Sequence, residues 1–240
     1  MLRCAMVVRS LHRWSVSPRR AIALQRELAP QVSRERDSGL AARPRLIAGG
    51  DLAFSPDGEQ CIAAVVVWDA EQQRVVEQVI ARRPLRFPYI PGLLSFREGP
   101  ALIAALRRLK TSPEVMLFDG QGLAHPRRLG LASHVGLWLG CPTIGCAKSR
   151  LVGQADEPGQ RRGTWTALHD GQEVIGAVLR TRDNVRPLYV SIGHRVDLPT
   201  AIDLTLACCT RYRLPEPTRL ADRLVAAARK TSQRHGTCGT

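Results

Sequence analysis

The segment 115–128 constrains the fold and the chemistry of this chain more than any other stretch. A short apolar run, Val115–Phe118, is bounded by Pro113 and Gly120 and is typical of a buried strand. Asp119 follows at its carboxyl end, which is where ligands bind in α/β sheets. The glycines that come next let the backbone approach a ligand, and the histidine and arginines behind them favour an anion. The pattern predicts a metal-dependent site for a phosphodiester.

The chain is strongly basic. Its 35 lysines and arginines face 21 aspartates and glutamates, which gives a net charge of +14 at pH 7. Hydrophobic residues make up 44% of 240 residues, so the chain is globular, and one or two domains fit this length. The charge favours a polyanion such as nucleic acid, although a basic protein without such a partner is the plainer alternative. No apolar run reaches membrane-spanning length, so we expect no membrane partner.

Cysteine usage and missing motifs narrow the class of protein. The seven cysteines are scattered, odd in number and without a CxxC pair, which argues against disulfides and favours a reducing compartment, so we expect a cytoplasmic protein. No two histidines have the spacing of zinc ligands, so a zinc site is not expected. Neither a GxSxG elbow nor a GxxxxGK[ST] loop is found, so the sequence favours neither a serine hydrolase nor a P-loop nucleotide hydrolase.

The spacing of apolar residues predicts one α/β domain with a mixed β-sheet. The proline-rich segment 87–92 cannot be regular, and 151–163 is polar and predicted as a loop. Strands are expected at 45–54, 61–68, 74–82, 115–118, 142–145, 173–179 and 187–192, with a hairpin joining the second and the third. Helices are expected at 21–34, where Pro30 would end or kink the helix, and at 101–109, 132–139, 200–209 and 219–230.

Acidic residues at strand ends are the candidate metal ligands. Phosphodiester hydrolysis usually employs one or two Mg²⁺ ions, each bound by few carboxylates and several waters. Asp51 ends an apolar strand, so Asp51 and Asp119 form a candidate pair if the two strands are neighbours. Glu98 precedes the helix expected at 101–109, where a favourable charge near a helix start, with Ser95 as cap, is the simpler explanation.

Three further polar residues each have two explanations. Asp222, one turn into the last expected helix, is either another active-site acid or a partner of the helix dipole. Lys148 follows a short strand, where it could bind phosphate, orient water or be a solvated surface charge. His125 could act as a general acid or contact a phosphate.

Five sequence blocks, in order, resemble the endonuclease V family of deoxyinosine-directed DNA repair nucleases. Any one block could mislead, but five in order are specific. Similarity runs from about Trp14 to Asp222, with Cys146 where the family usually has valine and Gln121 where relatives often have histidine. The blocks are 87–98 (FPYIPGLLSFRE), 119–134 (DGQGLAHPRRLGLASH), 142–148 (PTIGCAK), 193–195 (GHR) and 212–222 (YRLPEPTRLAD).

The resemblance implies a ribonuclease H-like fold, in which helices flank a mixed β-sheet. It implies a DNA repair endonuclease that hydrolyses the second phosphodiester bond 3′ to deoxyinosine, the product of adenine deamination. The water would be activated by Mg²⁺, or Mn²⁺ in its place, and the products would carry a 3′-hydroxyl and a 5′-phosphate. By this resemblance 14–230 is a single endonuclease V-like catalytic domain. We expect a monomer with a disordered extension at 1–13 and a loose tail at 231–240.

The resemblance also assigns individual residues. It makes Asp51 and Asp119 the metal ligands. The catalytic positions that it implies are Glu98, Asp222, Lys148 and His125.

A DNA wedge and a base pocket complete the implied site. Tyr89 is held between prolines, and a rigid aromatic tip can enter a base step, although packing on the core is the alternative. An extruded base needs a tight pocket, and glycines bring bare backbone against a purine, although ordinary turns also use glycine. The wedge comprises Pro88, Tyr89, Ile90 and Pro91; the pocket comprises Leu94, Gly120, Gly122, Gly130 and Leu151; the phosphate contacts are Arg127 and Arg128.

Two other functions stay open on sequence alone. The same site could accept inosine-containing RNA in place of DNA with deaminated purines. A nucleic-acid-binding module with a degenerate site is a different class, against which the four acids argue. Nicking of matched inosine-containing DNA and RNA strands, with Mg²⁺ and with EDTA, separates the three.

Overall fold

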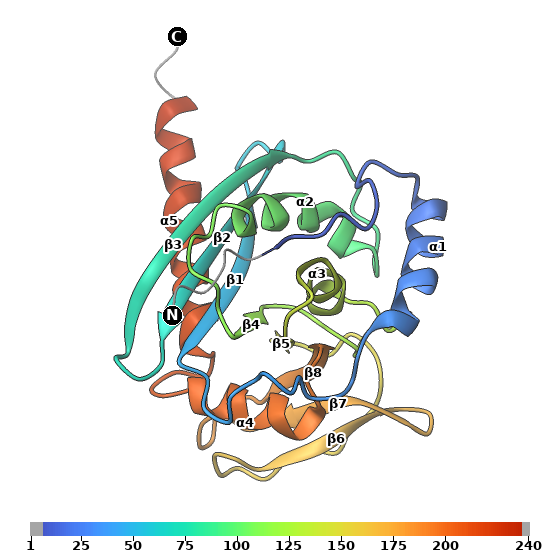
Figure 1. The fold of residues 1–240 in the computed structure, drawn as a ribbon, viewed down its shortest axis with the longest axis vertical. Helices are drawn as coiled ribbons and strands as arrows, with labels where there is room; N and C mark the ends of the chain where they lie inside the picture. The colour runs from blue at the N-terminus through green and yellow to red at the C-terminus, as the bar shows by residue number, and fades with distance from the viewer. Residues whose placement is uncertain (1–6, 237–240) are drawn as a thin grey trace.

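A mixed sheet of eight strands organises the computed structural model, which describes residues 7–236 of the chain (Figure 1). The strand order is β3-β2-β1-β4-β5-β8-β7-β6. The central neighbours β1, β4 and β5 pair in parallel, and each remaining neighbouring pair is antiparallel. The mixed sheet expected from the sequence is confirmed. The strands are β1 (Leu46–Phe54), β2 (Gln60–Asp69), β3 (Arg74–Pro84), β4 (Val115–Phe118), β5 (Thr143–Ala147), β6 (Trp165–Asp170), β7 (Glu173–Leu179) and β8 (Leu188–His194).

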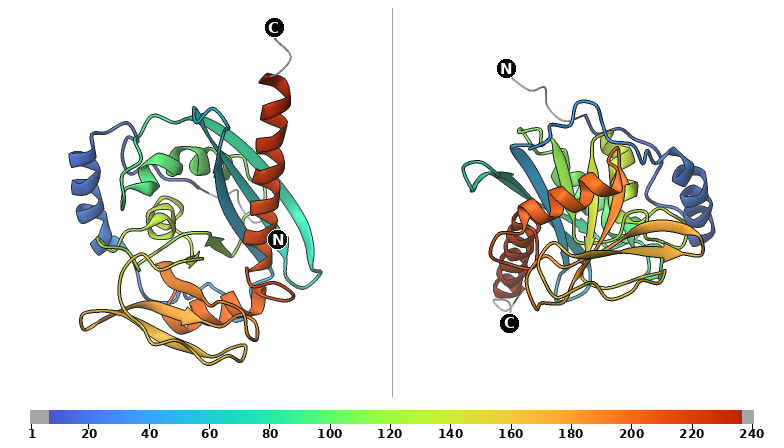
Figure 2. Two further views of the ribbon diagram at one scale, coloured as in Figure 1. Left: turned by 180° about the vertical axis from the view of Figure 1, so that it is seen from behind. Right: turned by 90° about the horizontal axis from the view of Figure 1, so that it is seen from below.

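Helices cover both faces of this sheet. α2 and α3 pack on one face, over a core that includes Met116 and Phe118 (Figure 1). α4 and α5 pack on the opposite face, and the reverse view in Figure 2 shows α5 lying across β1 and β2. The helices are α1 (Pro18–Leu28), α2 (Leu94–Leu106), α3 (Leu131–Leu139), α4 (Leu198–Cys208) and α5 (Glu216–Gly236), with a short 3-10 turn η1 (Ala29–Gln31) after α1.

The sequence of β4 explains why both faces are covered. Successive side chains of a strand point to opposite faces, so Met116 and Phe118 join the core under α2 and α3, while Val115 and Leu117 join the core under α4. A strand buried on both faces reads as a continuous apolar run, which β2 shows as well. Asp119, which ends the run, is therefore left at the carboxyl edge of the sheet.

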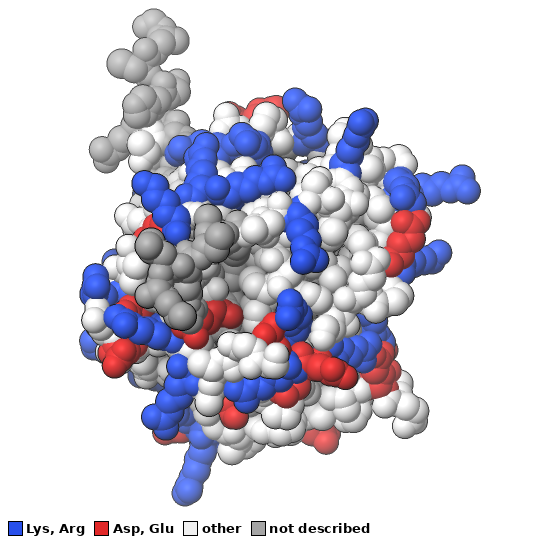
Figure 3. Space-filling model, viewed as in Figure 1, with Lys and Arg blue, Asp and Glu red and all other residues white. Residues whose placement is uncertain are grey.

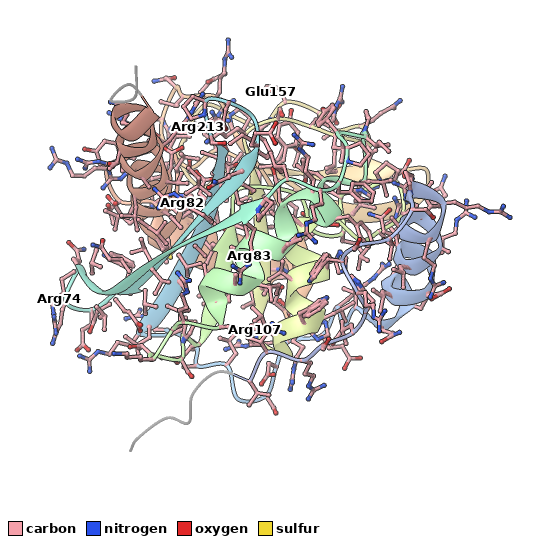
Figure 4. The ribbon with its side chains drawn as sticks, turned by 90° about the horizontal axis from the view of Figure 1, so that it is seen from above. Arg74, Arg82, Arg83, Arg107, Glu157 and Arg213 are labelled. Carbon is pink, nitrogen blue, oxygen red and sulfur yellow. The ribbon has the colours of Figure 1, made fainter. Side chains whose placement is uncertain are left out.

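β3 is an edge strand, and it is largely exposed and basic. Arg82 and Arg83 point to opposite faces: Arg82 Nη2 donates a hydrogen bond to the Ala228 carbonyl of α5, and Arg83 lies over α2 (Figure 4). Figure 3 shows Lys and Arg side chains gathered along the upper part of the face that carries α2. Charges on an edge strand discourage pairing with another chain. Here they also make the outer surface basic, which suits a polyanion.

α2 begins earlier than the sequence indicated. The predicted start was Ala101, but the helix begins at Leu94 and contains Pro100. Proline removes a helical hydrogen bond, and burial of most residues of α2 offsets this loss. Ser95 therefore lies inside the helix, and its hydroxyl contacts His134 Nδ1, so its predicted role as cap is wrong.

β6 was not predicted, because its burial follows no clear alternation. Only Leu168 of its six residues is fully buried, and the strand lies at the far edge of the sheet. The helix predicted at 21–34 ends at Leu28, and Pro30 stands in the short turn that follows. The other expected strands and helices are confirmed, with ends that differ by a few residues.

The chain ends are more ordered than expected. In the part of the predicted extension that the structure describes, 7–13, the Arg9 amide donates to the Trp138 carbonyl and His12 contacts His134. At the other end, α5 continues through 231–236, where a loose tail was expected. Residues 1–6 and 237–240 lie outside the described residues. Between 7 and 236, none of the helices has an apolar stretch long enough to cross a bilayer.

Candidate active site

Parallel pairing of β1 with β4 brings Asp51 and Asp119 side by side. Gly50 is in register with Phe118, and the Asp119 amide nitrogen lies 3.4 Å from the Gly50 carbonyl oxygen. Because parallel strands end at the same edge of a sheet, the next residue of each strand carries its carboxylate to one place. The adjacency on which the predicted pair depended is therefore found.

The helix α5 reaches this edge because β1 carries a glycine beneath it. A Cβ at Gly49 would lie 2.1 Å from the Pro217 carbonyl carbon, so only glycine allows the start of α5 to rest on the strand. Asp222 lies one and a half turns further along α5, and its charge acts on Asp51. On the opposite face, Glu98 of α2 is affected by the charges of Asp51 and Asp119. The four acids therefore converge from two strands and two helices.

Lys148, which directly follows β5, supplies positive charge to this cluster. Its Nζ lies 2.5 Å from Asp119 Oδ2 and 3.8 Å from Asp222 Oδ1. Lys148 is thus not a solvated surface charge alone. The structure brings it together with Asp51, Asp119 and Asp222, while His125 lies elsewhere, as described below.

Two carboxyl groups of the cluster bind protons unusually well. Burial, followed by repulsion from Asp119, raises the pKa of Asp51 to about 7. Burial, followed by repulsion from Asp51 and Asp119, raises the pKa of Glu98 to about 8. Both side chains are more than nine-tenths buried. Perturbed acids of this kind, gathered at a sheet edge, are typical of catalytic and metal-binding sites.

The oxygen donors of the cluster suit a hard divalent cation. Among the described residues, no three acidic, imidazole or thiol side chains converge closely enough to enclose an ion by themselves. Mg²⁺ does not require such a cage, since it binds one or two carboxylates and keeps several waters. The raised pKa values of Asp51 and Glu98 also indicate a lack of positive charge, which a cation would supply. The residues therefore fit a magnesium-like ion.

A small cavity of about 150 Å³ adjoins the acidic cluster on the side of α2 and α3. Tyr89 is 69% exposed at its rim, so packing on the core, the alternative considered from sequence, is wrong. Four of the five residues expected in the base pocket line this cavity, and Ile90, Pro91, Ser95, Gln121 and His125 line it as well. The four are Leu94, Gly120, Gly130 and Leu151.

Gly122, the fifth expected pocket residue, does not line this cavity. A Cβ at this position would lie 2.1 Å from the Ile192 carbonyl oxygen of β8. Its amide donates to Ser191 Oγ at 2.9 Å. Gly122 is therefore needed to pack the loop after β4 against β8. The same loop lines the cavity through Gly120 and Gln121, so this packing supports the cavity wall.

The Gly92 carbonyl oxygen anchors the proline-rich loop through three donors. Gln25 Nε2 lies 2.9 Å away, Arg127 Nη2 2.6 Å and His125 Nε2 3.0 Å. Gly92 itself has φ +76°, a conformation that favours glycine. The loop that carries Tyr89 is thus fixed at its base.

His125 supports this loop as a neutral ring. Its Nε2 donates to Gly92, and its Nδ1 accepts from the Arg127 amide, so both nitrogens are used. Burial, followed by the charge of Arg127, lowers the pKa of His125 to about 4. A neutral ring with both nitrogens engaged is poorly suited to donate a proton. In the structure His125 therefore supports the loop, and the general acid or phosphate contact considered from sequence stays a prediction.

Arg127 and Arg128 have protein partners. Arg127 Nε bonds to Gln25 Oε1, and Arg128 forms ion pairs with Asp170 and Glu173, both at 2.8 Å. The phosphate contacts expected of the two arginines stay a prediction, with which these protein partners compete.

Sequence reasoning missed Gln25 and the hydrogen-bond partner of Gln121. Gln25 is fully buried between Leu24 and Leu28 on the inner side of α1, and a polar residue among apolar neighbours was the available signal. Gln121 is buried in the cavity wall, where Nε2 donates to the Ser149 carbonyl and Oε1 has no partner among the described residues. Its position in the 119–134 block was noted, but a buried amide could not be inferred from it.

Acidic side chains where adjacent parallel strands end, on a mixed sheet flanked by helices, define a nuclease of the ribonuclease H-like fold. The family model for Endonuclease V matches residues 26–223, which is most of the chain. The chain belongs to the endonuclease V family.

Relatives and solved structures agree with this assignment. The endonuclease V of Alkalilimnicola ehrlichii is 51% identical over 220 residues, which is 92% of this chain and 96% of that protein. The crystal structure of endonuclease V from Streptomyces avermitilis superposes with a TM-score of 0.87 at 41% identity, covering 95% of this chain and 99% of that one. Endonuclease V of Ciona intestinalis, in complex with a 24mer DNA containing an inosine followed by a ribo-adenosine, gives a TM-score of 0.78 at 27% identity, covering 89% and 97%.

Proposed function

We propose that this protein is a DNA repair endonuclease that hydrolyses the second phosphodiester bond 3′ to deoxyinosine and leaves a 3′-hydroxyl and a 5′-phosphate. The observation that carries the proposal is the pair Asp51 and Asp119 beside a small cavity with a rigid aromatic rim. The DNA in the Ciona intestinalis complex contains an inosine, which supports the choice of lesion.

A divalent metal ion is part of this proposal. Asp51 and Asp119 would hold Mg²⁺, or Mn²⁺ in its place, and their oxygen donors support that choice. When bound, the ion would activate a water and stabilise the leaving oxygen. Lys148 holds Asp119 in position through their ion pair, and its ammonium group can also face a phosphate oxygen. Glu98 and Asp222 flank the pair from α2 and α5. Glu98 would release its proton when the cation binds, and its carboxylate would then add to the negative charge around the ion.

The small cavity would receive the damaged base. At about 150 Å³ it is below the roughly 300–1,000 Å³ of sites for drug-sized ligands, which suits one planar base. Tyr89 would enter the base step while Pro88 and Pro91 keep it rigid, at an unstacking cost of about a few kcal/mol. Leu94 and Leu151 would form apolar walls, and Gly120 and Gly130 would let the backbone approach the purine.

Product mapping on one duplex with a single deoxyinosine tests the proposal. We expect one nick at the second bond 3′ to the lesion in Mg²⁺, and none in EDTA. A nick elsewhere, or equal nicking of an undamaged duplex, would contradict the proposed lesion and break position. Binding without nicking in Mg²⁺ would instead indicate a nucleic-acid-binding module.

Inosine-containing RNA is the second candidate substrate. The ribo-adenosine after the inosine in the Ciona intestinalis complex favours testing it. Matched DNA and RNA strands with one inosine each should be cut at rates that favour DNA. A strong preference for RNA would make the protein an inosine-directed ribonuclease.

We further propose that the protein works as a monomer in a reducing compartment such as the cytoplasm. The proposed cavity and acidic cluster use residues of one chain. The free thiols of the described part support reducing conditions; they are Cys61, Cys141, Cys146, Cys208 and Cys209.

A further inference from the structure

A second and larger cavity adjoins the acidic cluster on the side of α5. Its volume is about 460 Å³, and it lies between β1 and α5. We name it the α5 groove. The residues that line it are Asp51, Leu52 and Ala53 of β1, and Asp222, Val225, Ala226, Arg229 and Lys230 of α5.

The residues from α5 form one stripe along the helix. Counted from Asp222, the other four stand three, four, seven and eight residues further on, which places them on one side of a helix. Asp222 stands at the end near the metal ligands, and Arg229 and Lys230 stand at the far end, exposed to solvent. Neither basic side chain forms an ion pair with another described residue. At about 1.5 Å per residue, Arg229 lies roughly 10 Å along the helix from Asp222.

This part of α5 is held firmly on the sheet. Val225 and Ala228 pack against Ile62 and Ala64 of β2. On the edge strand, Arg82 Nη2 donates to the Ala228 carbonyl oxygen at 3.0 Å. The basic end of the stripe thus has a fixed position relative to Asp51. Arg229 and Lys230 lie beyond residue 223, where the match to the endonuclease V family model ends.

The two cavities lie on opposite faces of the sheet: the α5 groove is lined by Asp51 and Asp222, and the base cavity by Gly120, the neighbour of Asp119. The base cavity is bounded by α2 and the start of α3, and the α5 groove by α5. In the proposed reaction the damaged base lies on the 5′ side of the bond that is cut. A strand with that base in the first cavity and its scissile phosphate at Asp51 and Asp119 would continue on its 3′ side toward α5.

We propose that the α5 groove binds the sugar-phosphate backbone of the cleaved strand on the 3′ side of the scissile bond. Arg229 and Lys230 contact its phosphates about three nucleotides beyond the break, since one strand carries a phosphate about every 3.4 Å along the helix axis. Their positive charges also offset the repulsion that Asp51 and Asp222 exert on the strand. The inference rests on the proposed function and adds the path of the substrate to it.

Two substrates and three variants test this path. Both substrates carry deoxyinosine in the same sequence; in one the strand continues a full helical turn past the scissile bond, and in the other it stops at the first nucleotide beyond. On the long substrate, Arg229→Gln and Lys230→Gln should each lower kcat/KM about five- to tenfold near 0.1 M salt and reduce the salt slope of binding by about one unit. On the short substrate they should match the unmodified protein. Arg223→Gln, on the same helix but outside the groove, is the matched control.

The outcomes separate this inference from the proposed function. If the unmodified protein cuts neither substrate, the proposed function fails; anisotropy with the uncut substrates in EDTA then still reports whether Arg229→Gln weakens binding of the long strand alone. If cutting occurs and the variants lose the same factor in kcat/KM on both substrates, the α5 groove is not the path of the 3′ strand. The same conclusion follows if their loss depends on the length of the strand on the 5′ side. Thermal unfolding of each variant verifies that it is folded.

Discussion

Lys148 Nζ and Asp119 Oδ2 lie 2.5 Å apart, at the point where β4 and β5 end side by side. Burial would lower the pKa of Lys148, but the bond to Asp119 and the nearby Asp51 and Asp222 raise it. The ammonium in turn lowers the pKa of Asp51, against the stronger effects of burial and Asp119. The positive charge of Lys148 therefore reduces the repulsion among the acids at this edge of the sheet.

Removal of this ammonium should impair cleavage far more than folding. We expect Lys148→Met to lower kcat about 10²–10³-fold, the usual cost of losing one fixed charge that stabilises a transition state. Steady-state cleavage of a deoxyinosine duplex measures the loss. Lys110→Met removes the same charge from an exposed site at the end of α2 and should keep nearly full activity. Equal losses in both variants would show that bulk charge, rather than this position, matters.

The raised pKa of Glu98 determines how the free energy of unfolding should depend on pH. Its pKa is raised from 4.5 in the unfolded chain to about 8 in the folded protein, so the folded state binds the proton more tightly. Stability of the metal-free protein should therefore fall as pH rises from about 4.5 to about 8. Glu98→Gln should flatten this loss and raise the free energy of unfolding at pH 8 by about 2–4 kcal/mol.

Urea unfolding in EDTA at several pH values measures the effect. Glu35→Gln is the control, because that side chain is exposed and should leave the pH slope unchanged. A Glu98→Gln variant with the pH slope of the unmodified protein would contradict the assignment of burial and repulsion to this carboxyl.

Two glycines of one loop should respond differently to a methyl group. At Gly122 a Cβ would meet the Ile192 carbonyl oxygen at 2.1 Å, and backbone cannot move aside cheaply. Gly122→Ala should therefore cost about 3 kcal/mol or more of stability. At Gly120 the nearest atom would be 3.5 Å away, on Leu131, so Gly120→Ala should fold normally but narrow the base cavity and slow lesion cleavage. The opposite order of stabilities would reject this reading of the loop.

Seven of the eight strands, and the acids that follow or end two of them, were predictable because they depend on short-range patterns. Val115–Phe118 is apolar throughout, and a single acid ends the run, so the strand and its site could both be read from a few residues. The contacts of His125 and Gly122 could not be predicted, because their partners, Gly92 and Ile192, are distant in the sequence. Residue type alone therefore could not show that burial lowers the pKa of His125 and that both of its ring nitrogens have protein partners.

Gln25 should set the precision of the wedge loop. Its amide donates to the carbonyls of Gly92 and Leu129 and accepts from Arg127 Nε. Gln25→Leu would leave Arg127 and the Gly92 carbonyl with fewer partners, which should cost about 1–3 kcal/mol. It should also lower cleavage of a deoxyinosine duplex more than binding of an undamaged one, since Tyr89 would lose its fixed position.

Gln31→Leu is the matched control, because that amide is exposed and bonds only locally, to the Glu27 carbonyl. Parallel losses of damaged and undamaged DNA binding in Gln25→Leu would argue that the glutamine supports the fold in general rather than the loop.

A chain of neutral rings connects the base cavity to the N-terminal segment. The Arg13 carbonyl can only accept, so His12 Nδ1 donates to it and His12 Nε2 must accept from His134 Nε2 at 2.7 Å. His134 Nδ1 then accepts from the hydroxyl of Ser95, which lines the cavity. The bond between the two rings requires that at least one of them be uncharged, and burial lowers the pKa of each histidine.

His12→Ala should therefore cost about 2–4 kcal/mol of stability, because it opens a gap in the ring cluster and leaves His134 Nε2 without its acceptor. In the unmodified protein the lowered pKa values give stability that is present above about 6.5 and is lost as pH falls below it, and the variant should lose less over that range. Thermal unfolding between pH 5 and pH 8 measures both effects. Arg13→Ala keeps the backbone carbonyl and truncates an exposed side chain, so it should resemble the unmodified protein. If His12→Ala were equally stable, residues 7–13 would contribute nothing to the domain, and the extension predicted from sequence would be the better description.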